Sequence, residues 1–374
     1  MKVALVHDWL TGLRGGERVL DELVGLFPDA DVHTLVHVPG STTPRIEARP
    51  IHTSPLSRLP GVGRHYRKLL PLFPWAVGQL RIPPCDLVLS TSHAVAKGVR
   101  PPPGSRHLCY CFTPMRYVWD QADAYLGQGV RRALAGPLIA GLRRWDRATS
   151  GVDRVHRFVA ISKVVAQRIR RHYGRSAAVL YPPVATERFA IRAGGPDDFY
   201  LLVGGFVPYK REDVAIEAFR ALGRPLLVAG DGPGRASLEA RAPAHVRFLG
   251  RVSDAELSEL YARCRALVYP QEEDFGIVPL EAQASGRPVI AYAAGGATET
   301  VVPLGDAAGR APTGVWFAEQ TPASLGDAVR TFEAQAAAFD PAAIRRHAER
   351  FGAARFRREM REAVEAALTG PPVA

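Results

Sequence analysis

Short apolar runs alternate with longer segments of helical periodicity along the chain, and this alternation limits the folds that the sequence can adopt. A helix that separates two strands carries the chain back across a sheet, so the order strand–helix–strand predicts a parallel sheet covered by helices. The first part of the chain predicts strands over 3–7, 31–35, 86–90, 107–112, 157–161 and 178–181, and helices over 17–27 and 163–173.

A second array of the same kind begins after Pro182-Pro183 and the loop 193–196. Its strands are predicted over 199–203, 225–229, 246–250, 266–269 and 288–292, and its helices over 211–222, 234–242, 254–264, 278–285, 298–302 and 341–368. We therefore expect an N-terminal domain over 1–190, a C-terminal domain over 191–350, and a helix over 351–374 that packs back toward the first domain. Doubly wound sheets bind ligands at the carboxyl ends of their strands, and we expect two α/β domains that face each other across a cleft.

Composition excludes several other classes. The chain has 374 residues, of which 47% are hydrophobic and 23% are charged, so it is neither disordered nor fibrous. No apolar stretch reaches the roughly 18 residues of a membrane-spanning helix. The start of the chain is interpreted as a strand rather than a signal peptide, and we expect a cytoplasmic protein. The four cysteines are too irregularly spaced to predict a disulfide framework or a zinc site.

The formal charge of +11 is unevenly distributed. Residues 1–185 contain 26 basic and 12 acidic residues, whereas the remainder contains 22 and 25. The segment 48–85 has no acidic residue and mixes basic with apolar and aromatic side chains, and a second basic cluster comprises Arg131, Arg132, Arg143, Arg144, Trp145 and Arg147. This pattern favours an anionic membrane surface as partner, and the alternative is an ordinary solvated basic face.

The most specific segment runs from Glu273 to Glu281 with the sequence EDFGIVPLE. It follows a predicted strand and enters a helix, with a proline in the first helical turn. Gly276 would let the backbone approach a ligand, and the amides of Gly276, Ile277 and Val278 would suit a diphosphate. Carboxylates on either side of such a phosphate site fit the hydroxyl groups of a nucleotide-sugar. The simpler alternative is an ordinary helix start with acidic residues near its dipole.

Two further positions fit a phosphate. Lys210 follows a predicted strand and Pro208 and opens a helix, which would aim its ammonium group at a leaving phosphate. Gly15-Gly16 stands at the first strand–helix turn. Each position also has a structural interpretation, as a solvated lysine or a simple turn.

The segment Glu273–Glu281 resembles the signature of retaining family-four glycosyltransferases of the GT-B fold. Motifs around Gly15-Gly16, Ser92–Gly98, Thr113–Trp119, Tyr181–Val184 and Val207–Arg211 resemble a bacterial branch that contains mannosyltransferases of surface polysaccharide assembly. The resemblance implies two Rossmann-like domains, a nucleotide-sugar donor on the second domain, and no required metal or other cofactor.

Carried over residue by residue, the resemblance assigns donor binding to Glu281, Phe275, Gly276, Ile277, Val278 and Gly205. It assigns catalytic roles to Lys210, Glu273 and Arg211, and it assigns Gly15, Gly16 and Arg116 to a phosphate and acceptor loop. The function implied is transfer of a sugar, preferentially mannose from GDP-mannose, to a saccharide or lipid-linked saccharide in surface polysaccharide or glycolipid assembly. The enzyme would lie on the inner face of the cytoplasmic membrane, with no nucleic acid as partner.

Two departures from the family pattern leave alternatives open. The family often has Arg where Gly205 stands, and the branch often has His where Phe112 stands. A nucleotide-sugar-binding protein with weak or lost transferase activity is therefore one alternative, and a transferase of a UDP-sugar is another.

Two motifs imitate other sites. Asp29-Ala-Asp31 matches a metal-binding Asp-x-Asp, but its place in a short link argues against a metal role. Gly230-Asp-Gly-Pro-Gly234 follows a mid-domain strand and lacks the spacing of a dinucleotide fingerprint, so we expect a turn.

Overall fold

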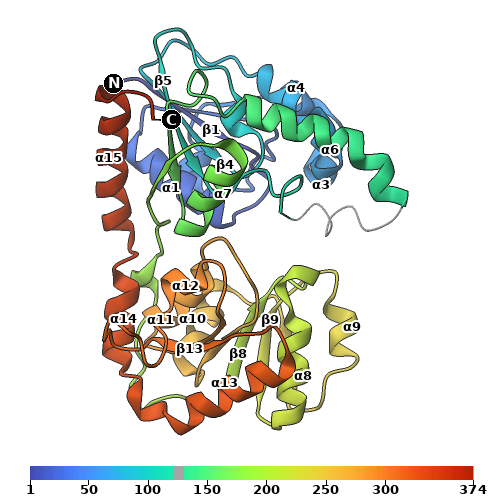
Figure 1. Cartoon of the computed structure of the whole chain (residues 1–374), viewed down its shortest axis with the longest axis vertical. Coiled ribbons are helices and arrows are strands. Elements are labelled where there is room, and N and C mark those ends of the chain that lie inside the picture. The colour runs from blue at the N-terminus through green and yellow to red at the C-terminus, as the bar shows by residue number, and fades with distance from the viewer. Residues whose placement is uncertain (121–129, 374) are drawn as a thin grey trace. The chain divides into compact units, whose positions relative to one another are not determined.

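The computed structural model describes residues 1–120 and 130–373, and in residues 130–135 it describes the backbone alone. The chain divides into two compact units (Figure 1). The first unit comprises Met1–Pro183 and Ala354–Ala374, and the second comprises Val184–Ala353.

The first unit is built on a parallel sheet of seven strands in the described residues, in the order β3-β2-β1-β4-β5-β6-β7. The strands are β1 Val3–His7, β2 Asp31–Thr34, β3 Ile51–Thr53, β4 Leu87–Ser92, β5 Arg106–Cys111, β6 Arg157–Ala160 and β7 Ala177–Val179. The central strand β4 is buried along its whole length, as expected for a parallel strand covered on both faces. The helices are α1 Gly15–Leu26, α2 Pro44–Glu47, α3 Val62–His65, α4 Phe73–Gly78, α6 Val130–Ala148, α7 Lys163–Tyr173 and α15 Ala353–Thr369, with short 3₁₀ helices η1 Pro55–Arg58, η2 Tyr66–Leu72 and η3 Ala96–Gly98.

The second unit has a parallel sheet in the order β10-β9-β8-β11-β12-β13. Its strands are β8 Tyr200–Gly204, β9 Leu226–Gly230, β10 Val246–Gly250, β11 Leu267–Tyr269, β12 Val289–Tyr292 and β13 Gly314–Phe317. Its helices are α8 Glu212–Leu222, α9 Arg235–Glu239, α10 Asp254–Arg263, α11 Ile277–Ala284, α12 Ala297–Thr300, α13 Pro322–Ala334 and α14 Pro341–Glu349, with η4 Thr186–Arg188, η5 Pro208–Lys210 and η6 Ala336–Ala338. The core of this unit joins β8, β9, β12 and β13 to helices α8 and α13.

The prediction of one final helix over 341–368 is wrong, because the chain forms α14 and α15 instead. Between them Phe351 is buried against Phe275, and the Phe351 carbonyl accepts a hydrogen bond from the Val184 amide. These contacts interrupt a segment whose helical periodicity continues on both sides. Helix α15 runs alongside the first unit (Figure 1), where Phe356 packs edge-on against Tyr110 and Arg357 pairs with Glu22.

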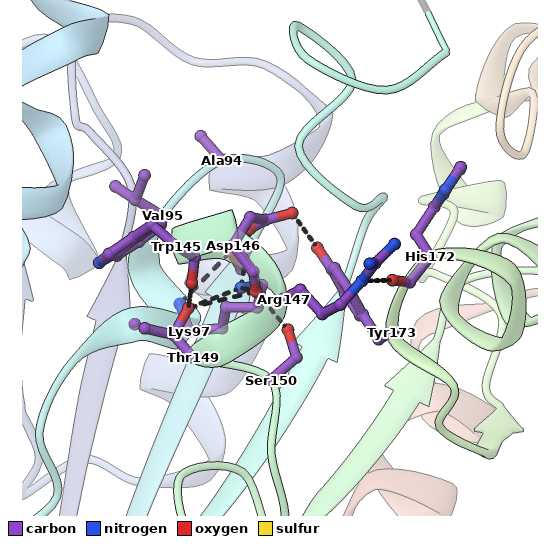
Figure 2. Close-up of polar contacts among 12 residues, drawn as sticks. Ala94, Val95, Lys97, Trp145, Asp146, Arg147, Thr149, Ser150, His172 and Tyr173 are labelled. Carbon is purple, nitrogen blue, oxygen red and sulfur yellow. Dashed lines mark hydrogen bonds and ion pairs between the residues drawn. The ribbon is translucent and has the colours of Figure 1, made fainter. Parts of the chain in front are cut away.

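A buried ion pair ties α6 to the rest of the first unit (Figure 2). Lys97 Nζ lies 2.8 Å from Asp146 Oδ1, and the two side chains are 2% and 0% exposed. The ammonium group also donates to the Asp146 carbonyl at 2.9 Å and to Thr149 Oγ1 at 3.1 Å. The second carboxylate oxygen of Asp146 accepts from Tyr173 Oη and Trp119 Nε1, both at 2.8 Å. Four segments therefore meet at one charge pair: η3, α6, α7 and the loop that follows β5.

Removing the lysine charge should destabilise the first unit, because the Asp146 carboxylate would remain buried without its counterion. For Lys97→Ala we expect a loss of about 3–5 kcal/mol in the free energy of unfolding. Urea unfolding followed by tryptophan fluorescence suits the measurement, since four of the five tryptophans lie in this unit. The exposed Lys68 provides the control Lys68→Ala, and equal midpoints for the two variants would contradict the prediction.

Candidate functional site

The loop between β11 and α11 presents the segment Glu273–Glu281 at the carboxyl end of a central strand of the second sheet. Gly276 has φ of +98°, a conformation that costs glycine little and other residues much, and it directly precedes the helix. The helix starts with Ile277 and Val278, whose amides belong to the first turn and have no acceptor within the helix. Gly276, Ile277 and Val278 thus form a helix start, as predicted, and their binding of a phosphate stays a prediction.

Lys210 and Glu273 come together across two loops of the second unit. Lys210 Nζ lies 3.0 Å from Glu273 Oε1, and the side chains are 20% and 29% exposed. Burial opposes the charge of Lys210, but Glu273 and other acidic neighbours outweigh it, so the pKa of Lys210 lies above its ordinary value. The ammonium group is therefore charged at neutral pH.

The backbone that presents Lys210 is strained on both sides. Phe206 and Arg211 have φ of +47° and +53°, in the left-handed region that non-glycine residues rarely adopt. The buried Glu212 carboxylate holds this loop by accepting a hydrogen bond from the Phe206 amide at 2.8 Å. Burial raises the pKa of Glu212. Strain of this kind persists where surrounding contacts enforce it, and it is common at functional sites.

The other predicted residues of the second unit lie around this pair. The Arg211 guanidinium faces Asp213, with Nε 3.2 Å from Oδ1, rather than Glu273. Glu281 Oε2 accepts a hydrogen bond from the buried Tyr261 hydroxyl at 3.0 Å, which fixes the carboxylate one turn into α11. Phe275 is buried. A Cβ placed on Gly205 would lie 3.8–3.9 Å from the Lys210 side chain, so this position has room for a larger residue.

Two glycine-rich turns support these loops. A Cβ on Gly232 would lie 2.0 Å from the Gly205 carbonyl oxygen, and one on Gly230 would lie 1.9 Å from that of Gly204. The segment 230–234 is thus a turn whose glycines allow backbone to pack on backbone, as predicted.

Sequence reasoning missed the second of these turns, Gly295-Gly296, which follows β12. A Cβ on Gly296 would lie 2.2 Å from the Phe275 carbonyl oxygen, and one on Gly295 would lie 2.4 Å from that of Glu273. The Gly296 amide donates a hydrogen bond of 2.7 Å to the backbone carbonyl of Glu273. The signal available in the sequence was a Gly-Gly pair directly after a predicted strand.

In the first unit, the predicted Gly15-Gly16 forms the first turn of α1 rather than a loop before it. A Cβ on Gly16 would lie 3.4 Å from the His7 ring and 3.5 Å from the Phe112 ring. Glu17 is buried, and its Oε1 lies 4.0 Å from His7 Nε2. Burial raises the pKa of Glu17. The neighbouring His7 and His93 and local hydrogen bonds outweigh this effect, so the pKa lies below its ordinary value.

A second group that sequence reasoning missed is the pair of Asp8 and His93. Asp8 directly follows β1 and is fully buried, and its carboxylate accepts hydrogen bonds from the four consecutive amides of residues 93–96 at 2.7–3.0 Å. The same carboxylate lies 3.1 Å from His93 Nδ1. The signal was a carboxylate immediately after an apolar strand, at the edge where parallel sheets bind ligands.

His93 is held by Asp8 and lies among other polar and aromatic groups. Its ring packs against Trp9 with centroids 4.4 Å apart, and its side chain is 23% exposed. Burial is the largest effect on its pKa, which lies below the ordinary value in spite of the Asp8 charge. The Arg116 charge contributes to the lowering, which places the predicted Arg116 in the same neighbourhood as His93. The imidazole is therefore neutral at pH 7.

The basic segment of the first unit presents both charged and apolar groups. Arg58, Arg64, Arg67 and Lys68 are exposed, as are the large apolar side chains of Leu59, Leu72 and Trp75. Tyr66, Phe73 and Leu80 of the same segment are buried in the core. Arg131 and Arg132 lie among the residues whose side chains the structure does not describe. No helix in the described part of the chain is long and apolar enough to cross a membrane.

Comparisons with known proteins bear on both units. Residues 184–351 match the family model described as glycosyl transferases group 1. The second unit is therefore similar in sequence to the group 1 glycosyl transferases. This segment coincides with Val184–Ala353 almost residue for residue, so the family's sequence pattern covers one complete unit, which we call the group 1 domain.

Two curated relatives resemble parts of the chain. An uncharacterised glycosyltransferase of Methanocaldococcus jannaschii is 31% identical over 169 residues, covering 44% of this chain and 47% of the relative. A GDP-mannose-dependent alpha-mannosyltransferase of Mycolicibacterium smegmatis is 35% identical over 151 residues, covering 38% and 40%. The matches therefore span less than half of each of these relatives.

The fold extends over both units. The crystal structure of Anabaena HepE in complex with UDP matches 98% of this chain and 100% of that one, with a TM-score of 0.70 and 17% identity. This likeness and the two parallel sheets confirm the predicted fold class, an α/β protein of the GT-B type with two Rossmann-like domains.

The contact between Gly296 and the loop of Glu273 yields a stability prediction. Gly296→Ala should lower the free energy of unfolding by about 1–3 kcal/mol, since its Cβ would overlap the Phe275 backbone. Gly141→Ala is the matched control, because this glycine lies in α6 with open space around it. The control should be neutral or gain up to about 1 kcal/mol from helix propensity. Thermal unfolding in a calorimeter measures both, and equal stability of the two variants would show that the turn does not pack as described.

Proposed function

We propose that the protein is a retaining glycosyltransferase that transfers mannose from GDP-mannose to a saccharide or lipid-linked saccharide acceptor. The observation that carries the proposal is the Lys210–Glu273 pair, which stands beside the first turn of α11 in the group 1 domain. A cation beside a helix start suits the diphosphate of a nucleotide-sugar, and the carboxylates of Glu281 and Glu273 suit the hydroxyl groups of its ribose and its sugar.

In the proposed complex, Lys210 and the α11 amides bind the diphosphate. As the glycosidic bond breaks, negative charge grows on the leaving phosphate, and the ammonium group of Lys210 stabilises it. Glu281 binds ribose hydroxyls, with its orientation set by Tyr261. Glu273 binds hydroxyls of the transferred sugar, and the leaving phosphate accepts the acceptor's proton. Positioning and charge stabilisation then account for the rate enhancement, and the proposal requires no metal ion.

The choice of GDP-mannose is supported by the mannosyltransferase among the relatives, whose name specifies that donor. UDP is the alternative, because the structural neighbour from Anabaena was solved with UDP. A protein that binds the nucleotide-sugar without transferring it is a second candidate, favoured by Gly205 and Phe112, where arginine and histidine would otherwise add polar groups.

Substitution of the paired residues should abolish transfer. In Lys210→Ala and Glu273→Ala we expect turnover to fall at least about 100-fold, the usual scale for removing one group that stabilises developing charge. The measurement is release of GDP from GDP-mannose with a lipid or saccharide acceptor panel. Arg220→Ala is the control, since Arg220 is an exposed residue of the same unit that pairs with Glu217.

Binding measured in parallel separates the alternatives. GDP should raise the melting temperature of the wild-type protein more than UDP does, because a ligand stabilises the state it binds. A larger melting-temperature shift with UDP would change the proposed donor to a UDP-sugar and leave the transferase proposal standing. If a nucleotide raises the melting temperature of the wild type but no transfer occurs, and Gly205→Arg with Phe112→His restores transfer, the binding protein would be favoured. Undiminished turnover in both alanine variants would refute the proposed site.

We further propose that the first unit docks on the cytoplasmic face of an anionic membrane to reach a lipid-linked acceptor. Exposed cations and exposed Leu59, Leu72 and Trp75 occur within one segment, which suits a headgroup interface. The remaining residues of the second basic cluster, Arg143, Arg144, Trp145 and Arg147, lie on α6 of the same unit.

Vesicle flotation tests this docking. The wild-type protein should float with vesicles that contain anionic phospholipid and remain unbound with neutral ones. Arg67→Glu with Lys68→Glu should reduce the bound fraction several-fold, since each basic residue near an anionic surface contributes about 1 kcal/mol. The control reverses two basic residues of the second unit, Arg247→Glu and Arg251→Glu. Equal flotation with neutral vesicles would rule out this role of the charge.

A further inference from the structure

Three side chains with metal-binding chemistry meet on the two outermost strands at one edge of the first sheet. Strands β2 and β3 pair in parallel, with His33 directly opposite His52. Asp31 stands two residues before His33, and since side chains alternate along a strand, both point to the same face. One ligand atom from each of Asp31, His33 and His52 lies within 4.8 Å of the others.

The three groups are already in contact without an ion. His52 Nε2 lies 2.9 Å from Asp31 Oδ2, and the His33 and His52 rings lie 4.8 Å apart between centroids, with planes 20° from parallel. The Asp31 and His52 side chains are 36% and 50% exposed, so solvent reaches the cluster from one side.

His33 is the independent observation that points to a ligand. It is fully buried, and neither of its ring nitrogens has a hydrogen-bond partner in the described part of the chain. Buried polar groups in folded proteins are nearly always paired, so such an imidazole calls for a bound group.

We propose that Asp31, His33 and His52 form a binding site for a divalent transition-metal ion such as Zn²⁺. Two imidazoles and one carboxylate suit zinc, cobalt or nickel, whereas magnesium and calcium prefer sites made of oxygen ligands. Three protein ligands leave at least one position to water. The ion would join β3, an edge strand of three residues, to β2.

This site goes beyond the proposed transferase function and does not depend on it. Asp31 is the first residue of β2, whereas Asp8 and Phe112, which belong to the candidate site of this unit, directly follow β1 and β5 at the carboxyl ends. Asp29-Ala-Asp31 was expected to have no metal role as an Asp-x-Asp motif. Of that motif the proposal uses only Asp31, and its other two ligands are histidines outside the motif.

Direct metal binding to the full-length protein tests the proposal. After treatment with a chelator, the protein is titrated with Co²⁺, whose ligand-field absorption reports the donor set, and with Zn²⁺ by calorimetry. We expect one ion per chain, with affinity reduced about 100-fold or more in His52→Ala and in His33→Ala. His65→Ala is the control, because His65 is exposed on α3 outside the cluster.

A second readout covers variants that fold poorly. His52 is half exposed, so its loss should not impair folding even if His33→Ala does. Zn²⁺ should slow hydrogen exchange of the amides in β3 in the wild type and in His65→Ala, but not in His52→Ala. Wild-type affinity in His52→Ala, or no saturable binding of either ion, would overturn the proposal. None of these measurements uses a nucleotide, so they are decided independently of transferase activity.

Discussion

Parallel strand pairing places every loop that follows a strand at the same edge of its sheet, and the candidate sites of both units depend on this constraint. In the second unit it brings the loops after β8, β11 and β12 together, although they are separated by about ninety residues of chain. Lys210, Glu273 and Gly296 belong to these three loops in turn. In the first unit the same constraint gathers Asp8, His93 and Phe112 from the ends of β1, β4 and β5.

Buried carboxylates then give these loops their shape. Asp8 satisfies four consecutive amides that no strand or helix would pair, and Glu212 does the same for the Phe206 amide beside two residues of positive φ. A loop amide buried without an acceptor is costly, so each carboxylate fixes one backbone path. Lys97 and Asp146 play a similar part in the first unit, where a complete ion pair joins four segments.

Much of this organisation is predictable from the sequence, because it depends on local patterns. Strand–helix alternation predicts six of the seven described strands of the first sheet and five of the six strands of the second, and it predicts helix Lys163–Tyr173 to the residue. The nine residues from Glu273 predict the loop that leads into α11 of the group 1 domain. The features that could not be predicted depend on contacts between distant segments. The break between α14 and α15 follows from the burial of Phe351, and the pairing of His33 with His52 follows from strand register. Strands β3 and β13 were missed because they have only three and four residues, too few for a clear strand pattern. The roles assigned to Lys210, Arg211 and Gly15 remain predictions, although the structure brings Lys210 to Glu273 and directs Arg211 to Asp213.

The ion pair between Lys210 and Glu273 also has a consequence for ligand selection. A ligand that recruits the ammonium group must first compete with a carboxylate that already holds it at 3.0 Å. A singly charged or neutral molecule offers Lys210 little more than Glu273 does. A diphosphate offers two phosphate groups, and the freed carboxylate can then accept hydrogen bonds from hydroxyl groups. The pair would thus act as a threshold that small anions of the cell do not pass. Every ligand that binds Lys210 must break this ion pair. Only a ligand with both an anionic part and a polyhydroxylated part gives new partners to both the ammonium group and the carboxylate.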